Sequence, residues 1–345
     1  MTPEKPIRAA VVGVGAFGRN HARVYRELAQ QDGPDRINVE LAGIVDADAA
    51  RAAAVAEEYG SASFASLKEL VQSGVQAASV AVPTVEHLKV ARELMEAGVD
   101  VLVEKPLASS LEEADELIRV AQRTGRVAQA GHLERFNPAV RATLPLVTQP
   151  LFFEVHRLSV FTPRALDVDV VLDLMIHDLD IVLSLVKSPV KEVRAVGLPI
   201  LSGKVDIANV RVEFDSGCVA NFTASRVSTE KVRKLRFFQP RQYVSVDYSR
   251  QDVLVFSVAG DPGAAEAAEP PAHPSSPNIA VTRPAVTAEE PLHAELRAFL
   301  DAVRRRSKPV VPLEDGRRAL AVALDILAQI REHGRRINLE GIVRQ

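Results

Sequence analysis

The sequence predicts an α/β protein of two domains. We expect a doubly wound parallel sheet in the N-terminal domain and an α+β arrangement with an open, mostly antiparallel sheet in the C-terminal domain. Over about the first 133 residues, short apolar runs alternate with amphipathic segments, as in a parallel sheet covered by helices on both faces. After that point, apolar and polar side chains alternate along each expected strand, which is typical of a sheet with one face toward water. We therefore place the domains at residues 1–133 and 134–345.

The expected strands of the first domain are short, apolar and rich in β-branched residues. They span residues 7–12, 39–45, 77–82, 100–103 and 127–130. Two of the helices between them span residues 85–97 and 111–124. Ser109 and Ser110 precede the second of these helices as candidate N-caps, and Gly98 and Gly125 stand where C-caps belong. This alternation of strand and helix indicates a parallel sheet.

The antiparallel sheet of the second domain includes an expected hairpin, in which strands 206–214 and 218–225 flank the turn Asp215-Ser216-Gly217. Further strands are expected at 231–238, 243–248 and 253–258. Residues 259–291 are rich in Ala, Pro and Glu and lack periodicity, so we expect a mobile surface loop there. Two helices, at 292–305 and 315–333, close the chain and can pack back on the first domain.

The composition excludes several classes of protein. With 47% apolar and 25% charged residues, the chain is an ordinary globular protein, and a net charge of −3 gives no reason to expect nucleic acid or a membrane as partner. Cys218 is the only cysteine, which excludes intramolecular disulfides and cysteine metal cages. The N-terminus resembles a strand rather than a signal peptide, and no uncharged apolar stretch reaches the ~20 residues of a membrane span. We expect a cytoplasmic protein.

A glycine-rich loop, Gly13-Val14-Gly15-Ala16-Phe17-Gly18, follows the first expected strand and opens an expected helix. This context is the one that the dinucleotide-binding (Rossmann) fingerprint requires. Gly13 permits a tight turn, Gly15 lets backbone N–H groups approach a pyrophosphate, and Gly18 lets helix and strand pack closely. Glycines also serve ordinary turns, but the strand–helix context favours a nucleotide. The expected cofactor-binding residues of the loop are Gly13, Gly15, Ala16, Phe17 and Gly18.

Asp46 ends the second expected strand. An acid at this position would bond both ribose hydroxyls of NAD and repel the 2′-phosphate of NADP. The alternative is that Asp46 caps the helix that starts near Ala49. Arg51 lies nearby, and its positive charge would favour the 2′-phosphate of NADP. We expect NAD as the cofactor, with NADP less favoured.

Further polar residues follow the third and fourth expected strands, where such sheets bind their ligands. Thr84, after Pro83, would cap a helix whose free N–H groups face the cofactor. His87 would either touch the nicotinamide ribose or cover the helix surface. Lys105 follows a buried strand directly and needs a partner, and a desolvated lysine suits a reacting oxygen. We expect Pro83, Thr84, His87 and Glu104 at the cofactor and Lys105 in catalysis.

Residues 170–186 predict an almost wholly apolar helix that one polar line crosses. Asp173, His177, Asp180 and Ser184 recur at helical spacing and would share one face. A buried Asp–His line must face something polar, because stranding it in an apolar core costs several kcal/mol. Two alternatives stay open. One is a metal site, although no second histidine sits at a chelating interval, and the other is a structural hydrogen-bonded pair.

The motifs Gly-x-Gly-x-x-Gly, Pro-Thr-x-x-His, Glu-Lys-Pro and Asp-x-x-x-His occur in this order. Together they resemble the glucose–fructose oxidoreductase / inositol dehydrogenase / rhizopine-catabolism (Gfo/Idh/MocA) family over about residues 7–335. The resemblance implies an NAD(P)-dependent oxidoreductase acting on CH–OH groups, in which Lys105, Asp173 and His177 flank the nicotinamide and the reacting carbinol. It also implies a second domain with an open sheet that often forms homodimers or homotetramers.

These three residues suit the oxidation of a secondary alcohol, which removes the O–H proton while hydride leaves the carbon. His177 is suited to act as general base near neutral pH. Asp173 would orient the imidazole or bond a neighbouring hydroxyl, and Lys105 would stabilise the developing alkoxide. Because family members differ over whether the lysine or the histidine takes the proton, that assignment stays open.

The substrate is suggested by residues 131–138, which place polar side chains at the domain junction, where pockets form. Arg135 and Asn137 are the expected sugar-binding residues, although Glu134 can instead pair with Arg135. With Pro163-Arg164 and Asp167-Val168, this stretch is similar to the nucleotide-sugar branch of the family. That resemblance implies oxidation of UDP-N-acetylglucosamine, or a close relative, to the 3-keto sugar used for diamino-sugar lipid A.

Four basic residues of one strand would bind the diphosphate, unless they are only exposed charges: Lys231, Arg233, Lys234 and Arg236. The expected substrate-binding residues are therefore Arg135, Asn137, Arg164, Lys231 and Arg233, and no metal is expected. Three other functions stay open. They are a dehydrogenase of a free polyol or monosaccharide of the inositol type, an NAD(P)H-dependent reductase of a ring system, and a non-catalytic nucleotide-sensing protein.

Overall fold

The computed structural model describes residues 5–33, 36–162, 168–258 and 279–338. The chain divides into two compact units, residues 1–136 with 290–320 and residues 137–289 with 321–345. This division differs from the sequence-based domains in two respects. Residues 134–136 belong to the first unit, and so do residues 290–320, which the sequence analysis had counted with the second domain.

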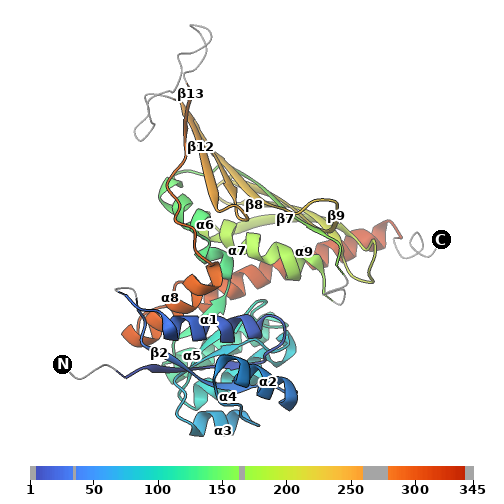
Figure 1. The fold of residues 1–345 in the computed structure, drawn as a ribbon. Helices are drawn as coiled ribbons and strands as arrows, with labels where there is room; N and C mark the ends of the chain where they lie inside the picture. Colours follow the sequence, from blue (N-terminus) through green and yellow to red (C-terminus); the bar gives the residue numbers. More distant parts are fainter. Residues whose placement is uncertain (1–4, 34–35, 163–167, 259–278, 339–345) are drawn as a thin grey trace. The chain divides into compact units, whose positions relative to one another are not determined.

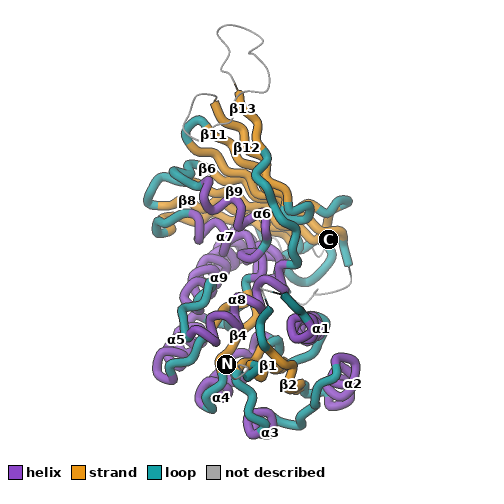
Figure 2. The backbone as a smooth tube through the Cα atoms, turned by 60° about the vertical axis from the view of Figure 1, so that its left-hand side comes forward, coloured by secondary structure: helices purple, strands orange, loops and turns teal. Residues whose placement is uncertain are grey.

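The first unit contains a five-stranded parallel sheet in the order β2-β1-β3-β4-β5 (Figures 1 and 2). The doubly wound parallel sheet is thus confirmed. The strands are β1 (Ile7–Val12), β2 (Val39–Val45), β3 (Ala77–Val80), β4 (Asp100–Glu104) and β5 (Ala128–Gly131). The helical elements are α1 (Gly18–Gln30), α2 (Ala49–Tyr59), α3 (Leu67–Gln72), η1 (Thr84–Glu86), α4 (His87–Glu96), α5 (Leu111–Thr124), η2 (Leu133–Phe136) and α8 (Pro291–Arg305). The strand order reverses between β1 and β3, and ligands of such sheets bind at the carboxyl ends of the strands beside that point.

Local sequence explains where these elements begin and end. All residues of β3, β4 and β5 are buried, as expected for strands covered on both faces. The Ser110 hydroxyl accepts a hydrogen bond from the Glu113 N–H and caps α5, as the sequence predicts. Gly125 ends α5 at φ +63°, a conformation that glycine adopts without strain.

The second unit contains an eight-stranded sheet in the order β13-β12-β11-β10-β6-β9-β8-β7, antiparallel except between β6 and β9. The open, mostly antiparallel sheet is confirmed. Its strands are β6 (Phe152–Val160), β7 (Val190–Leu198), β8 (Ile207–Phe214), β9 (Val219–Ser228), β10 (Val232–Gln239), β11 (Gln242–Asp247), β12 (Asp252–Val258) and β13 (Ile279–Thr282). The helical elements α6 (Pro138–Thr143), η3 (Leu144–Leu146) and α7 (Ile176–Leu185) also belong to this unit, as does the later part of α9 (Leu313–Arg336). In Figure 1 the helices of this unit lie on one side of the sheet.

The loop expected over residues 259–291 needs a correction. Ile279–Thr282 forms strand β13, which pairs antiparallel with β12 at the edge of the sheet. Four residues are too few to show a periodicity in the sequence, and the pairing with Val255–Val258 supplies the backbone partners that hold the segment. Residues 259–278 lie outside the described residues.

The expected helix over residues 170–186 is also corrected. Val171–Met175 forms a π-helical turn, η4, and α7 follows it. The N–H of Ile176 donates to the carbonyl of Val171, five residues earlier, so this turn is wider than an α-helical one. The α-helical spacing assumed for the polar line therefore does not hold before Ile176.

A buried ion pair anchors α7 to the sheet. Arg157 of β6 and Asp178 of α7 are both about 2% exposed, and they form two hydrogen bonds, of 2.6 Å from Nε and 2.9 Å from a terminal nitrogen. The guanidinium also lies over the ring of Tyr248, 5.2 Å from its centre. Because Asp178 follows His177 directly, this pair fixes the segment that carries the candidate catalytic histidine.

We predict that Asp178→Asn lowers the free energy of unfolding by about 3–5 kcal/mol, because it leaves the Arg157 charge buried without its partner. The double variant Arg157→Met/Asp178→Leu removes both charges and should recover most of the loss. Urea unfolding followed by circular dichroism measures both. A double variant as unstable as Asp178→Asn would contradict this account.

Candidate active site

The glycine-rich loop has the shape that a pyrophosphate site needs. Gly13 adopts φ +86°, and a β-carbon there would lie 2.7 Å from the backbone of Ala81. A β-carbon on Gly18 would lie 1.8 Å from the Gly13 oxygen, so the loop folds tightly onto the start of α1. By contrast, a β-carbon on Gly15 would meet open space, which leaves room for a ligand over the exposed stretch from Gly15 to Phe17. Within the described chain no side chain caps α1, so its N-terminal N–H groups suit a phosphate.

Asp46 is held at this loop. Its carboxylate accepts hydrogen bonds from the N–H of Val14 at 2.7 Å, the N–H of Asp48 at 2.9 Å and the guanidinium of Arg51 at 2.7 Å. Burial would raise the pKa of Asp46, but the hydrogen bonds from Arg51 and the two backbone N–H groups outweigh it and lower the pKa. The alternative role as helix cap falls to Asp48, whose side chain accepts from the Arg51 N–H at the start of α2.

The expectations for Thr84 and His87 need correction. Pro83 precedes η1, and in the described chain neither η1 nor α4 has a side-chain cap, so Thr84 does not cap a helix. His87 is 1% exposed, which prevents contact with a ribose. Its Nε2 lies 2.9 Å from the Val82 oxygen and its Nδ1 lies 3.1 Å from the Pro106 oxygen. Burial lowers the pKa of His87, although the hydrogen bonds to these carbonyls act to raise it.

Glu104 makes buried contacts within the first unit, and Lys105 remains the catalytic candidate at the end of the same strand. The Glu104 carboxylate is 6% exposed and lies 3.0 Å from Nε2 of His21, on α1. Its other oxygen accepts from the Lys105 N–H at 3.2 Å. Lys105 is half-buried at the carboxyl end of β4, and its peptide bond to Pro106 is cis. We therefore withdraw Glu104 as a cofactor contact and retain Lys105 as the catalytic candidate of this unit.

Asp173 and His177 occupy consecutive turns in the second unit. Asp173 is half-buried in η4, and His177 is 8% exposed in the first turn of α7. Within α7, His177, Asp180 and Ser184 keep the helical spacing of one face, and the Ser184 hydroxyl donates to the Ile181 carbonyl at 2.6 Å. Asp180 is 1% exposed. The described residues contain no group of three or more His, Cys, Asp or Glu arranged to hold a metal ion.

The structure does not support Arg135 and Asn137 as substrate residues. Arg135 is 13% exposed and pairs with Asp315 at 2.9 Å within the first unit. Asn137 is 2% exposed, accepts from the Ala139 N–H at 3.1 Å and donates to the Tyr248 carbonyl at 3.1 Å. Asn137 is thus a buried helix cap, and its 2% exposure leaves almost no surface for a sugar.

The basic residues of β10 divide between the two faces of the sheet. Arg233 lies opposite Arg157 in the register, on the face that α7 covers. Lys234 and Arg236 lie on the other face by strand alternation, and Arg236 pairs with Glu154 at 2.9 Å. Lys231 is exposed just before β10. The four residues therefore do not form one diphosphate site, and Arg164 lies outside the described residues.

The sequence analysis missed four residues that support the candidate catalytic groups: His21, Ser79, Arg157 and Asp178. Two of them, Arg157 and Asp178, have a signal in the sequence. In β6, alternation puts Arg157 on the same face as Phe153 and Val155, and a charge on an apolar face requires a partner. Asp178 is likewise a charge within an apolar helix. The pattern shows that partners exist but does not show which residues they are.

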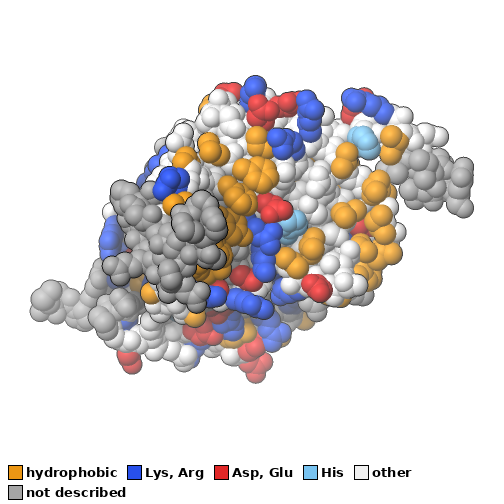
Figure 3. Space-filling model, turned by 90° about the horizontal axis from the view of Figure 1, so that it is seen from above, with side chains coloured by type: hydrophobic (Ala, Val, Ile, Leu, Met, Phe, Trp, Pro, Cys, Tyr) orange, Lys and Arg blue, Asp and Glu red, His pale blue; other side chains and the backbone are white. Residues whose placement is uncertain are grey.

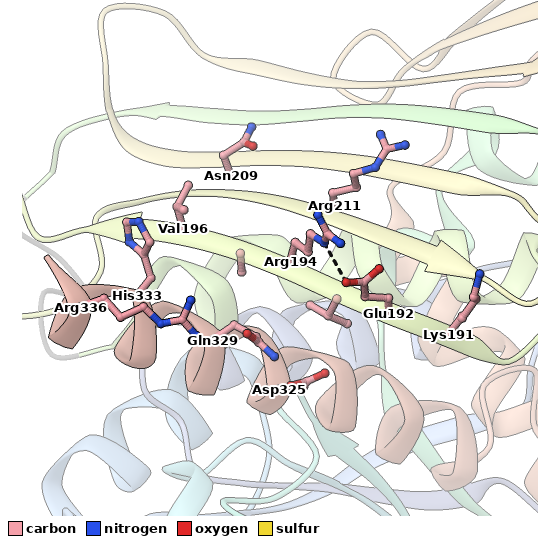
Figure 4. Close-up of a pocket in the computed structure, with 12 residues that line it drawn as sticks. Lys191, Glu192, Arg194, Val196, Asn209, Arg211, Asp325, Gln329, His333 and Arg336 are labelled. Atoms are coloured by element: carbon pink, nitrogen blue, oxygen red, sulfur yellow. Dashed lines mark hydrogen bonds and ion pairs between the residues drawn. The ribbon is translucent and has the colours of Figure 1, made fainter.

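A groove of about 760 Å³ in the second unit contains none of the expected site residues. It runs between the edge strand β7 and helix α9 and is lined largely by charged side chains, such as Arg194 and Glu192, which pair at 2.8 Å (Figure 4). Charges on an edge strand keep it from pairing with another chain. We assign this groove no ligand. In the part of the chain that is described, no helix has both the length and the apolar character to cross a membrane.

Comparison with known proteins decides the family. Residues 7–132 match the model described as an oxidoreductase family with an NAD-binding Rossmann fold, and residues 149–244 match the GFO/IDH/MocA C-terminal domain. The chain belongs to the Gfo/Idh/MocA oxidoreductases. The resemblance inferred from its motifs is thus confirmed, as is its class as an NAD-dependent enzyme.

Individual relatives cover most of the chain. The chain is 36% identical over 326 residues to UDP-N-acetylglucosamine 3-dehydrogenase from Acidithiobacillus ferrooxidans, which covers 93% of this chain and 96% of that one. A solved structure of that enzyme has a TM-score of 0.84 at 34% identity, covering 95% and 98%. Scyllo-inositol 2-dehydrogenase (NAD(+)) from Bacillus subtilis is 29% identical over 65% of this chain and 69% of its own.

The contrast between Gly13 and Gly15 gives a direct test of the loop. Gly15→Ala puts a methyl group into the open space over the loop, so we predict normal folding and NADH binding weaker by about tenfold, or about 1.4 kcal/mol. Gly13→Ala should instead lower the melting temperature, because the β-carbon strikes the Ala81 backbone. Gly203→Ala, where a β-carbon also meets open space, serves as the control. NADH fluorescence is a clean readout, since the chain has no tryptophan. Unchanged NADH affinity in Gly15→Ala would place the pyrophosphate elsewhere.

Proposed function

We propose that this protein is a dehydrogenase that oxidises the 3-hydroxyl of UDP-N-acetylglucosamine, or of a closely related nucleotide sugar, to the ketone. The observation that carries the proposal is the 36% identity to a UDP-N-acetylglucosamine 3-dehydrogenase over 93% of this chain. The retained Lys105, Asp173 and His177 support catalysis rather than nucleotide sensing. The 3-keto product is chemically suited to amination, and we propose that it feeds diamino-sugar lipid A synthesis.

In the first unit, the chain's residues bind the cofactor and stabilise charge. When bound, NAD supplies the hydride acceptor for the carbinol carbon. The N–H groups of the glycine loop bind the pyrophosphate, and the carboxylate of Asp46 accepts from the ribose hydroxyls. The ammonium of Lys105 donates a hydrogen bond to the substrate oxygen and stabilises the negative charge that develops there.

In the second unit, His177 removes the proton from the substrate hydroxyl. Asp173, in the preceding turn, orients the substrate or the imidazole. Arg233 is the basic residue of β10 that we retain for the diphosphate, because it lies on the face of the sheet that α7 covers. Arg135 and Asn137, expected at the sugar, have no part in this proposal.

A second candidate function is the oxidation of a free polyol of the inositol type. The 29% identity to scyllo-inositol 2-dehydrogenase over 65% of this chain favours it. A free polyol has no diphosphate, so UDP alone competes with the substrate only under the first proposal.

We also propose that the protein is a homo-oligomer that associates through the open face of the sheet in the second unit. Phe152, Phe238, Tyr243 and Phe256 form an aromatic row across four adjacent strands, with ring centres 5.7, 4.9 and 5.4 Å apart. Phe238 is 37% exposed, and Val281, opposite Phe256 in β13, is 48% exposed. Figure 3 shows apolar side chains beside charged ones on this side of the molecule. Exposed apolar rows of this kind are typical of interfaces.

The catalytic proposal is tested by incubating the protein with NAD and either UDP-N-acetylglucosamine, UDP-glucose, myo-inositol or scyllo-inositol. We predict NADH formation with UDP-N-acetylglucosamine and inhibition by UDP. Lys105→Ala and His177→Ala should each lower kcat by about 10²- to 10⁴-fold, because each removes a group that acts on the reacting hydroxyl. Lys89→Ala, at an exposed position of the first unit, is the control that should keep full activity. Turnover of an inositol without inhibition by UDP would support the second candidate instead.

The oligomer is tested by the double variant Phe238→Lys/Val281→Lys, which places two charges on the aromatic row. We predict a shift to the monomer mass of 37.4 kDa in light scattering after size exclusion. Val85→Lys, a charge at a 70% exposed apolar position of the first unit, should leave the mass unchanged. An oligomer that survives the double variant must associate through another surface.

A further inference from the structure

Four buried side chains of the first unit form a hydrogen-bonded chain that ends beside Lys105. The Tyr25 hydroxyl lies 2.9 Å from the Ser79 hydroxyl, which lies 2.9 Å from Nδ1 of His21, and Nε2 of His21 lies 3.0 Å from the Glu104 carboxylate. Tyr25, Ser79 and His21 are 0% exposed, and Glu104 is 6% exposed. Three different elements, α1, β3 and β4, contribute to this chain.

For a neutral His21 imidazole, counting donors gives this hydrogen-bonded chain one direction. A neutral imidazole donates from one nitrogen and accepts at the other, and the carboxylate can only accept. Nε2–H of His21 therefore donates to Glu104, and Nδ1 accepts from the Ser79 hydroxyl. The Ser79 oxygen then accepts from Tyr25, whose pKa is raised by burial, so that its hydroxyl stays protonated as the first donor. Each of the three donors in this series of hydrogen bonds has an acceptor.

Ser79, His21 and Glu104 have the connectivity of a hydrolytic Ser–His–acid triad, but they cannot act as one. A nucleophilic serine must be reachable by its substrate, and Ser79 is fully buried in β3 with its oxygen already accepting from Tyr25. These hydrogen-bonded side chains must therefore act through the groups that they hold in place.

The group at the end of the chain is the backbone of Lys105. The second carboxylate oxygen of Glu104 accepts from the Lys105 N–H at 3.2 Å. On the other side of Lys105, the carbonyl of Pro106 meets Nδ1 of His87 at 3.1 Å. Glu104 has little room to turn away, because even a β-carbon on Gly131 would lie 2.8 Å from its carboxylate. Lys105 is thus held on both sides by buried groups, and its flexible side chain starts from a fixed point.

We infer that His21 is a positioning residue that acts through Glu104 to hold Lys105 in its catalytic place. His21 belongs to the first turn of α1, which starts at the last glycine of the loop. The hydrogen-bonded side chains therefore also connect the phosphate-binding loop to the catalytic lysine. This inference depends on the proposed function, in which Lys105 stabilises charge on the substrate oxygen. It assigns a role in the reaction to a residue that touches neither substrate nor cofactor.

Two substitutions of His21 separate its two contacts. In His21→Gln the amide can take the place of Nε2 and still donate to Glu104, whereas the shorter side chain of His21→Asn can reach only toward Ser79. We expect His21→Asn to lower kcat by about 10- to 100-fold with an unchanged Kd for NADH, because a small displacement of a catalytic group has effects of this size. His21→Gln should recover most of the rate.

Asp100→Asn is the matched control. Asp100 lies at the opposite end of β4, is 3% exposed, and accepts from the Val127 N–H at 2.8 Å and from Arg306. Its substitution should lower the melting temperature without changing kcat. If His21→Asn likewise lowers only the melting temperature, the positioning role is overturned. If His21→Asn does not fold, Ser79→Ala decides, because it removes the donor to Nδ1 and should lower kcat in the same direction.

Combination with Lys105→Ala distinguishes this inference from the proposed function. If His21 acts only through Lys105, His21→Asn should cause no further loss in residual activity when Lys105 is already alanine. A full additional loss would show that His21 acts by another route and overturn the inference while leaving the function standing. If Lys105→Ala keeps wild-type activity, the proposed role of Lys105 fails, and the inference fails with it.

Discussion

The buried carboxylate of Glu104 is the constraint on which the candidate site of the first unit depends. A carboxylate with 6% exposure has lost its water and must receive hydrogen bonds from the protein. One donor comes from His21 on α1 and another from the backbone of Lys105. Because α1 begins at the glycine loop, the hydrogen bonds that Glu104 receives fix both the phosphate-binding segment and the segment that carries Lys105. It also explains why the facing position of β5 is Gly131, which has no side chain to occupy the same space.

In the second unit a buried carboxylate, that of Asp178, likewise receives its hydrogen bonds from a distant basic residue, Arg157. Asp178 directly follows His177, just as Glu104 directly precedes Lys105, and in both cases the buried acid bonds a basic residue of a neighbouring element. Consecutive residues of a helix point in different directions, so the acid can face the interior while its neighbour faces elsewhere. Anchoring a segment through the next residue in sequence holds the backbone of the candidate catalytic residue still. A π-helical turn lies just before His177, and such turns occur frequently at functional sites.

The sequence predicted those parts of the fold and site that follow from local pattern. Strands β1 and β2 were placed residue for residue, and the glycine loop was identified by its position between β1 and α1. The errors arose where a side chain's partner lies far away in sequence. Asn137 was expected at the sugar because it is polar and near the domain junction, but its amide caps α6 and bonds Tyr248, which is 111 residues away. The role of His87 could not be decided locally either, since nothing nearby in sequence reveals that the carbonyl of Pro106, 19 residues away, would contact its ring. Spacing along the chain identifies candidates, and only the fold shows how deeply each is buried and which distant groups it contacts.

The choice of NAD illustrates how burial decides between two opposing signals. Asp46 disfavours a 2′-phosphate, whereas Arg51 would attract one, and in the structure the two pair at 2.7 Å. Their side chains differ sharply in exposure, 5% for Asp46 against 48% for Arg51. The carboxylate is fixed by two backbone N–H groups and keeps its charge because its pKa is lowered. The guanidinium is a solvated group whose charge is screened by water and salt. The fixed, poorly solvated charge therefore sets the local potential, and this favours the ribose hydroxyls of NAD over a second phosphate.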